Sequence, residues 1–161
     1  MPPLRIKLTV KDATSSLHTV PPLLRSLHHF VPTSSYPLLP LLRLHALLLT
    51  QPSSLLQLNS AISSLASAYS GAESVYPPYH PTLAIILSEW GKLLAVEIPS
   101  DWASPNRNDI AARLKSAIVV LRKAVQACEM GFGKGGGLVG KEMEGLLRGC
   151  EGELGLLRST R

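Results

Sequence analysis

The sequence predicts an all-α fold, a short tetratricopeptide-like array of antiparallel helix pairs with five or six helices. Three observations predict it. Leucine dominates an apolar content of 45%, and aromatic residues make up only 5% of the 161 residues, a composition that favours helix packing over a β-sandwich. Apolar residues recur at helical spacing through most of the chain. A proline corner that opens an apolar helix occurs twice, about 44 residues apart, as in helical repeats.

The N-terminal residues 1–11 differ from the rest of the chain. Residues 4–11 alternate apolar and polar side chains, which is the period of a β-strand, but no second strand follows to pair with them. We expect 1–11 to be a short extended or flexible segment, either a frayed tail or a strand that pairs with a sheet outside this chain. The helical domain is expected to cover 12–161.

The first two helices of this domain flank a proline corner. Residues 12–30 have a weak helical pattern, which Pro21 and Pro22 are expected to break or restart because proline lacks an N–H and clashes with the preceding turn. The corner at 31–37 leads into an apolar helix at 38–50.

The third helix is expected over 55–76. It follows a tight connection with serines suited to capping a helix. Gly71 is expected to weaken its final turns, because glycine loses more conformational freedom in a helix than other residues do.

The fourth helix, around which the fold is expected to form, starts at a second proline corner. His80 occupies the cap position and Pro81 the first turn, where a missing N–H costs nothing. Gly91 interrupts the apolar face at a place where a second helix could approach closely. The helix is expected to end near residue 98, and its apolar face consists of Leu83, Ile86, Leu87, Trp90, Leu93 and Leu94.

Two further helices are expected in the C-terminal part of the chain. A polar loop at 99–108 precedes a helix that Asp109 caps or opens. A glycine-rich turn at 131–137 separates that helix from a closing helix at 138–157. Gly145, Gly149, Gly152 and Gly155 lie inside the closing helix, and each costs about 0.5–1 kcal/mol relative to alanine, so this helix is expected to be the least stable.

Composition excludes several classes of protein. The formal net charge of +5 is modest and its lysines and arginines are scattered, which argues against nucleic-acid binding. Two cysteines, Cys128 and Cys150, are too few for a disulfide-dense scaffold or a four-cysteine zinc site. The most apolar run, 38–49, is shorter than the roughly 20 residues of a membrane span. Without a secretory leader, we expect no membrane association and a cytoplasmic or nuclear location.

Motifs that carry chemistry are incomplete in this sequence. Residues 131–136 match G-x-G-x-x-G, but a helix rather than the required strand is expected before them. The five histidines have no H-E-x-x-H spacing and no accompanying carboxylate cluster, and no G-x-S-x-G motif is present. We therefore expect no catalytic residue, no metal and no cofactor in this chain.

The second helix pair matches the tetratricopeptide pattern in detail. Trp90 and Gly91 fall where that repeat has a large residue followed by glycine in its first helix. Ala117, Leu121 and Ala124 reproduce the small, bulky, small spacing of its second helix. Small residues let two helices approach closely, and the bulky residue fills the space between them.

The order of short motifs resembles the C-terminal helical domain of the SET-and-MYND class of protein lysine methyltransferases, particularly fungal members. The His-Pro corner at 80–81, Gly-Lys-Leu at 91–93, the Leu-Arg-Lys-Ala segment at 121–124 and the Leu-Leu-x-x-Cys segment at 146–150 occur in the family's order, and the resemblance covers 36–157. The Asn-His-(Ser/Cys) segment with which the family binds S-adenosylmethionine is absent, and two cysteines cannot build its zinc finger. The resemblance therefore implies the tail module without its enzyme.

We accordingly expect a noncatalytic protein-interaction or regulatory module with a protein or peptide partner. One alternative is a fragment of a methyltransferase that uses S-adenosylmethionine and whose catalytic SET domain is missing from this chain; another is an unrelated helical scaffold. In tetratricopeptide folds the first helix of each pair lines the concave groove. The residues expected to face this groove are Ile85, Ser88, Lys92 and Ala95, and Lys92 is expected either to meet an acidic peptide or to be a solvated surface lysine. The oligomeric state is left open.

Overall fold

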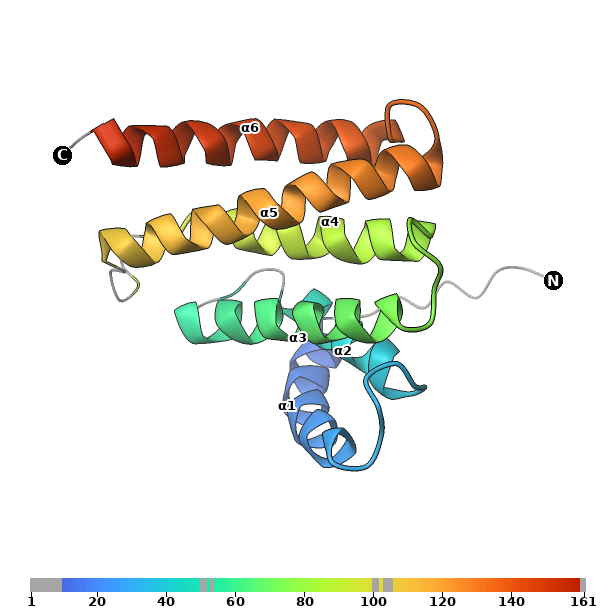
Figure 1. Ribbon diagram of the computed structural model, residues 1–161. Helices are drawn as coiled ribbons and strands as arrows, with labels where there is room; N and C mark the ends of the chain where they lie inside the picture. The colour runs from blue at the N-terminus through green and yellow to red at the C-terminus, as the bar shows by residue number, and fades with distance from the viewer. Residues whose placement is uncertain (1–9, 50–51, 53, 100–101, 103–105, 160–161) are drawn as a thin grey trace.

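The computed structural model describes residues 10–49, 52, 54–99, 102 and 106–159. These residues contain six helices and no strand, which confirms the all-α class and the expected number of helices. The helices are α1 (Val10–His28), α2 (Leu38–Leu48), α3 (Leu55–Glu73), α4 (Pro81–Ala95), α5 (Arg107–Phe132) and α6 (Gly137–Ser159). Successive helices pack against each other, and α4 also contacts α6. Figure 1 shows α3 to α6 running back and forth as neighbouring layers, with α1 crossing below α2 and α3.

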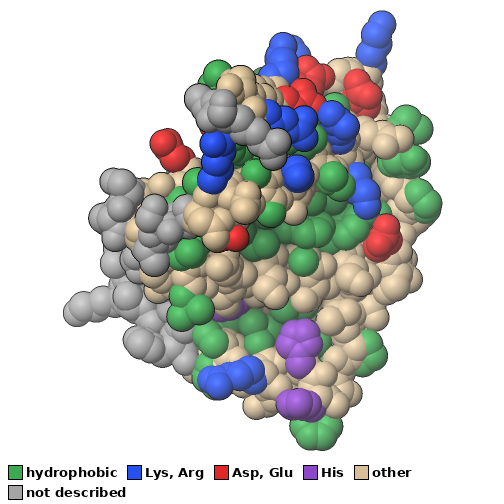
Figure 2. Space-filling view, turned by 60° about the vertical axis from the view of Figure 1, so that its left-hand side comes forward, with side chains coloured by type: hydrophobic (Ala, Val, Ile, Leu, Met, Phe, Trp, Pro, Cys, Tyr) green, Lys and Arg blue, Asp and Glu red, His purple; other side chains and the backbone are tan. Residues whose placement is uncertain are grey.

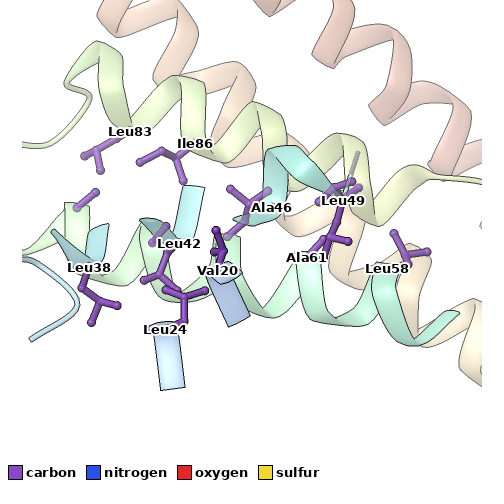
Figure 3. Close-up of a cluster of buried hydrophobic side chains, with 14 residues drawn as sticks. Val20, Leu24, Leu38, Leu42, Ala46, Leu49, Leu58, Ala61, Leu83 and Ile86 are labelled. Atoms are coloured by element: carbon purple, nitrogen blue, oxygen red, sulfur yellow. The ribbon is translucent and has the colours of Figure 1, made fainter. Parts of the chain in front are cut away.

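Helix α4 joins two hydrophobic cores. Leu83, Ile86 and Leu93 belong to a core shared with α1, α2 and α3, part of which is drawn in Figure 3. Leu87 and Leu94 belong to a second core shared with α5 and α6. A helix that is apolar around most of its circumference is typically buried, and α4 satisfies this rule by lying between the two cores.

Helix α1 runs through its two prolines. The expectation that Pro21 and Pro22 break the helix is wrong, because both lie inside α1. Val20 and Leu24, on either side of the pair, are each only 6% exposed in the first core, and their packing stabilises a helix that local propensity disfavours. The extended segment expected at 1–11 lies outside the described residues except for its last two, which belong to α1.

Local capping determines where three helices begin. The side chain of Ser54 accepts a hydrogen bond from a backbone N–H of α3 at 3.3 Å. His80 Nδ1 accepts one from the first turn of α4 at 3.2 Å, and Pro81 is the first residue of that helix. Asn106 Oδ1, rather than Asp109, caps α5: it accepts the backbone N–H of Asp109 at 2.9 Å. Asp109 instead lies in the first turn, where a carboxylate favours the helix dipole.

The connections are shorter or longer than expected by a few residues. Helix α3 ends at Glu73 and α4 at Ala95, earlier than the expected 76 and 98. The glycine-rich turn expected at 131–137 is confined to 133–136, because α5 continues to Phe132 and α6 starts at Gly137. The corner at 74–80 and this turn lie at the same end of the array (Figure 1).

Candidate functional site

The groove expected on α4 is partly closed by neighbouring helices. Ser88 is only 4% exposed; its hydroxyl donates to the Ala84 carbonyl at 2.7 Å and lies 3.7 Å from Cys128 Sγ on α5. The prediction that Ser88 faces a groove is therefore wrong, because α5 covers this small side chain. Ile85 is exposed, and Ala95 is half-buried against the second core.

Lys92 lies at the surface and forms an ion pair within the chain. Its Nζ is 2.8 Å from Glu142 Oε2 on α6, so the acidic group beside it comes from this chain. One turn earlier on α4, Glu89 Oε1 lies 2.8 Å from Arg43 Nη2 of α2. These ion pairs connect alternate helices of the array, α2 to α4 and α4 to α6. Both pairs are partly exposed, and such pairs contribute at most about 1 kcal/mol each.

Gly91 lies where α4 packs against the Leu121 side chain of α5. A Cβ atom at this position would be 2.6 Å from Leu121 Cδ2. Leu121, Ala117 and Ala124 are fully buried in the second core. Trp90 is half-buried and packs against both cores, with its ring centroid 6.0 Å from that of Tyr69. These residues pack in the interior of the fold, so a binding site is more readily formed by other surfaces.

A tyrosine-lined cleft lies at the surface of the described part of the chain. We use this name for a cleft of about 270 Å³ between α3, α4, α5 and the corner at 74–80. Three of the four tyrosines of an aromatic-poor chain line it. Its lining residues are Tyr69, Glu73, Tyr76, Pro78, Tyr79, Leu83, Leu87, Lys123, Gln126 and Ala127.

Each tyrosine of the cleft is held by a neighbour. The Tyr69 hydroxyl donates to Glu73 Oε1 at 3.0 Å. The Tyr76 ring stacks on the His80 ring with centroids 4.5 Å apart and planes inclined by 17°. The Tyr79 hydroxyl accepts a hydrogen bond from Gln126 Nε2 at 3.2 Å. Burial, together with the neighbouring Glu73 carboxylate, raises the pKa of Tyr69 to about 12.

Tyr79 adopts an unusual backbone conformation. Its φ is 63°, and it has the only positive φ among the described residues other than glycine. Such conformations cost on the order of 1–3 kcal/mol, persist only where the surroundings enforce them, and cluster at binding sites. The end of α5 packs closely against this residue: a Cβ at Gly131 would be 2.8 Å from the Tyr79 carbonyl oxygen.

A second polar feature, the His45–Ser64 pair, lies beside a groove between α1, α2 and α3. His45 Nδ1 is 2.8 Å from Ser64 Oγ, and both side chains are buried. Burial lowers the pKa of His45, which keeps the imidazole neutral near pH 7. The pair satisfies both side chains inside the core and connects α2 to α3.

The surface is unevenly charged. On the face shown in Figure 2, Lys, Arg, Asp and Glu side chains gather over the upper part, which is formed by α5 and α6, and are sparse over the lower part. Among the described residues no three His, Cys, Asp or Glu side chains come together as a metal site. None of the helices in the described part of the chain is long and apolar enough to cross a membrane.

Sequence reasoning missed two sets of residues. Arg113 of α5 donates hydrogen bonds from Nε and Nη2 to the carbonyls of Leu93, Leu94 and Val96 at 2.8–3.0 Å. These bonds satisfy carbonyl groups at the C-terminal end of α4 and connect it to α5. No local pattern marks this contact. The tyrosine-lined cleft did have a signal, the Tyr-Pro-Pro-Tyr-His-Pro run at 76–81, whose prolines predict a corner and a helix start and whose tyrosines also line the cleft.

Comparison of the chain with protein-family models, with curated proteins and with solved structures found no match.

Proposed function

We propose that this chain is a noncatalytic protein-interaction module that binds a peptide segment of its partner in the tyrosine-lined cleft. The observation that carries the proposal is the gathering of three of the four tyrosines at one surface cleft. Tyrosine provides a large, rigid contact area at little entropic cost and is enriched at the residues that dominate binding energy.

The size and composition of the cleft support a peptide rather than a large cofactor. A volume of about 270 Å³ lies just below the roughly 300–1,000 Å³ of sites that enclose a drug-sized ligand, and it is sufficient for one or two side chains. The cleft combines an apolar floor, Leu83 and Leu87, with polar groups at its rim. An apolar floor with a few convergent polar groups is the usual composition of a recognition site.

The resemblance to the C-terminal domain of SET-and-MYND methyltransferases supports the same class of function. In that family the corresponding domain offers a helical surface to partner proteins, and the all-α array of this chain is compatible with such a role. A cytoplasmic or nuclear location is part of this proposal. The alternative, a fragment of the methyltransferase itself, rests on the motif order alone.

The experiment that tests this proposal is a selection of random peptides on the folded chain, followed by binding measurements with two tyrosine variants. Tyr79→Gly removes a ring of the cleft, and glycine adopts a φ of 63° without strain. Tyr36→Ala is the matched control, because Tyr36 is the fourth tyrosine and is 87% exposed outside the cleft. We expect selected peptides to bind the wild type and Tyr36→Ala equally and to lose affinity for Tyr79→Gly. Failure to select any peptide, or equal binding to all three proteins, would contradict the proposal.

A further inference from the structure

We propose that a basic groove between α5 and α6 is a second binding site of this chain and that it accepts a phosphate monoester. We use the name basic groove for a groove of about 540 Å³ whose lining includes Arg107, Asn108, Lys115, Leu154, Leu157 and Arg158. The start of α5 and the end of α6, which form it, lie side by side at one end of the array (Figure 1). The tyrosine-lined cleft contacts the other end of α5, so this proposal does not depend on the proposed function.

Three cationic side chains line the basic groove, and none of its described lining residues is acidic. Arg107 and Lys115 come from α5, eight residues apart, and Arg158 comes from the last turn of α6. Like charges gathered at one surface repel each other. An anion bound among them removes this repulsion, so the charge of the groove favours an anionic ligand.

The acidic residues that are close to the groove in sequence lie elsewhere or are already paired. Asp109 follows Arg107 by two residues, which places it about 200° around the helix from that arginine. Glu153 lines a separate groove. Glu151 lies one turn before the part of α6 that lines the basic groove, but its Oε1 is 2.7 Å from Arg122 Nη2. These carboxylates therefore leave the basic groove to an anion from outside.

The polar groups of the groove are accessible to a ligand. Lys115 and Arg158 are exposed, and within the described part of the chain neither side chain forms an ion pair or a hydrogen bond. Arg107 Nη2 donates to the carbonyl of Leu157, which holds this guanidinium beside the end of α6. The exposed side-chain amide of Asn108 adds a neutral donor next to it.

A phosphate monoester matches these groups better than a carboxylate does. It carries a charge of about −1.5 to −2 near neutral pH and three strong acceptor oxygens, whereas a carboxylate carries one charge and two oxygens. Guanidinium groups bind phosphate through paired hydrogen bonds, and lysine binds it as a point charge. Arg107 and Lys115 start about 12 Å apart along the helix axis, a distance that two long side chains can shorten by leaning toward each other. The groove also has room for the group that carries the phosphate.

The test titrates the full chain with phosphoserine that is acetylated and amidated, and with inorganic phosphate. Acetylated, amidated glutamate is the carboxylate control, and ionic strength is held constant. Binding is followed by backbone amide chemical shifts in ¹⁵N-labelled protein. We expect saturable shifts at the start of α5 and the end of α6 with both phosphate ligands, and binding of the glutamate derivative that is weaker by about fivefold or more. Tighter binding of phosphoserine would identify a phosphorylated side chain as the source of the phosphate, and tighter binding of inorganic phosphate would identify the free ion.

Two variants test whether the groove itself holds the phosphate. Lys115→Gln and Arg158→Gln each remove one charge from the groove without breaking a described ion pair, and each is expected to weaken binding by about fivefold to tenfold. Lys141→Gln is the matched control, because it removes the same charge from an exposed position of α6 outside the groove. We expect it to bind phosphate as the wild type does.

Three results would overturn the proposal. The first is the absence of saturable binding by either phosphate ligand. The second is equal weakening by Lys115→Gln and Lys141→Gln, because net charge rather than the groove would then attract the anion. The third is equal binding of the phosphoserine and glutamate derivatives, which would show that the groove does not select a phosphate.

Discussion

Replacing Gly71 by alanine is expected to destabilise the chain, although alanine is the better helix former. An alanine Cβ at residue 71 would lie 2.4 Å from the carbonyl oxygen and 2.5 Å from the carbonyl carbon of Thr33. These are backbone atoms of the corner between α1 and α2, so no side chain can rotate away. Helix propensity alone would favour alanine by about 0.5–1 kcal/mol. Overpacking of a tight site costs about 1–3 kcal/mol, and we expect this cost to prevail.

Gly149→Ala provides the matched control. Gly149 lies inside α6, is exposed, and would have no atom within 4 Å of an added Cβ. Alanine there is expected to stabilise the chain by about 0.5–1 kcal/mol. The free energy of unfolding of each variant is measured by urea denaturation with far-ultraviolet circular dichroism. If Gly71→Ala proves as stable as wild type or more stable, the close approach of the corner to α3 is wrong.

Three further predictions concern packing, pH and surface charge. Gly91→Leu is expected to unfold the chain or lower its melting temperature strongly, because even a Cβ there would lie 2.6 Å from a buried leucine side chain; an unchanged melting temperature would contradict the α4–α5 contact. Burial lowers the pKa of His45 below 6.5, so the stability that the neutral imidazole contributes is complete above about pH 6.5 and is lost as the pH falls below it. His45→Gln should flatten this part of the unfolding profile, whereas His28→Gln, at an exposed position, should not. Lys92→Glu places a second carboxylate beside Glu142 and should lower the free energy of unfolding by at most about 1 kcal/mol, while peptide binding in the cleft stays unchanged. A larger decrease in the free energy of unfolding, measured by urea denaturation, would contradict the small contribution expected of this ion pair.

The sequence was most informative where structure depends on neighbours along the chain. Helical periodicity predicted the all-α class and the central place of α4. Cap residues act within one turn, and His80 and Pro81 were recognisable for that reason. Gly91 was also recognisable, because a lone glycine on an apolar helix face marks a close helix contact.

The parts that could not be predicted depend on contacts between distant segments. Gly71 was interpreted as a weak point of its helix, but the corner that contains Thr33 packs against it and requires a residue without a side chain. The two positions are nearly forty residues apart, and local patterns do not report contacts over such a separation. The prolines of α1 stay helical because of packing that is invisible in the local pattern. Gln126 joins the tyrosine-lined cleft only because α5 returns beside the corner at 74–80.

The position of α4 between two cores has a consequence for how the molecule opens. Because α4 contributes buried leucine side chains to both cores, neither half of the array can separate without exposing apolar surface of the other. Segments of this kind exchange their amide hydrogens only through global unfolding, while the ends of an array can open locally. The amides of α4 should therefore be the slowest to exchange with deuterium, and their rate should report the stability of the whole domain.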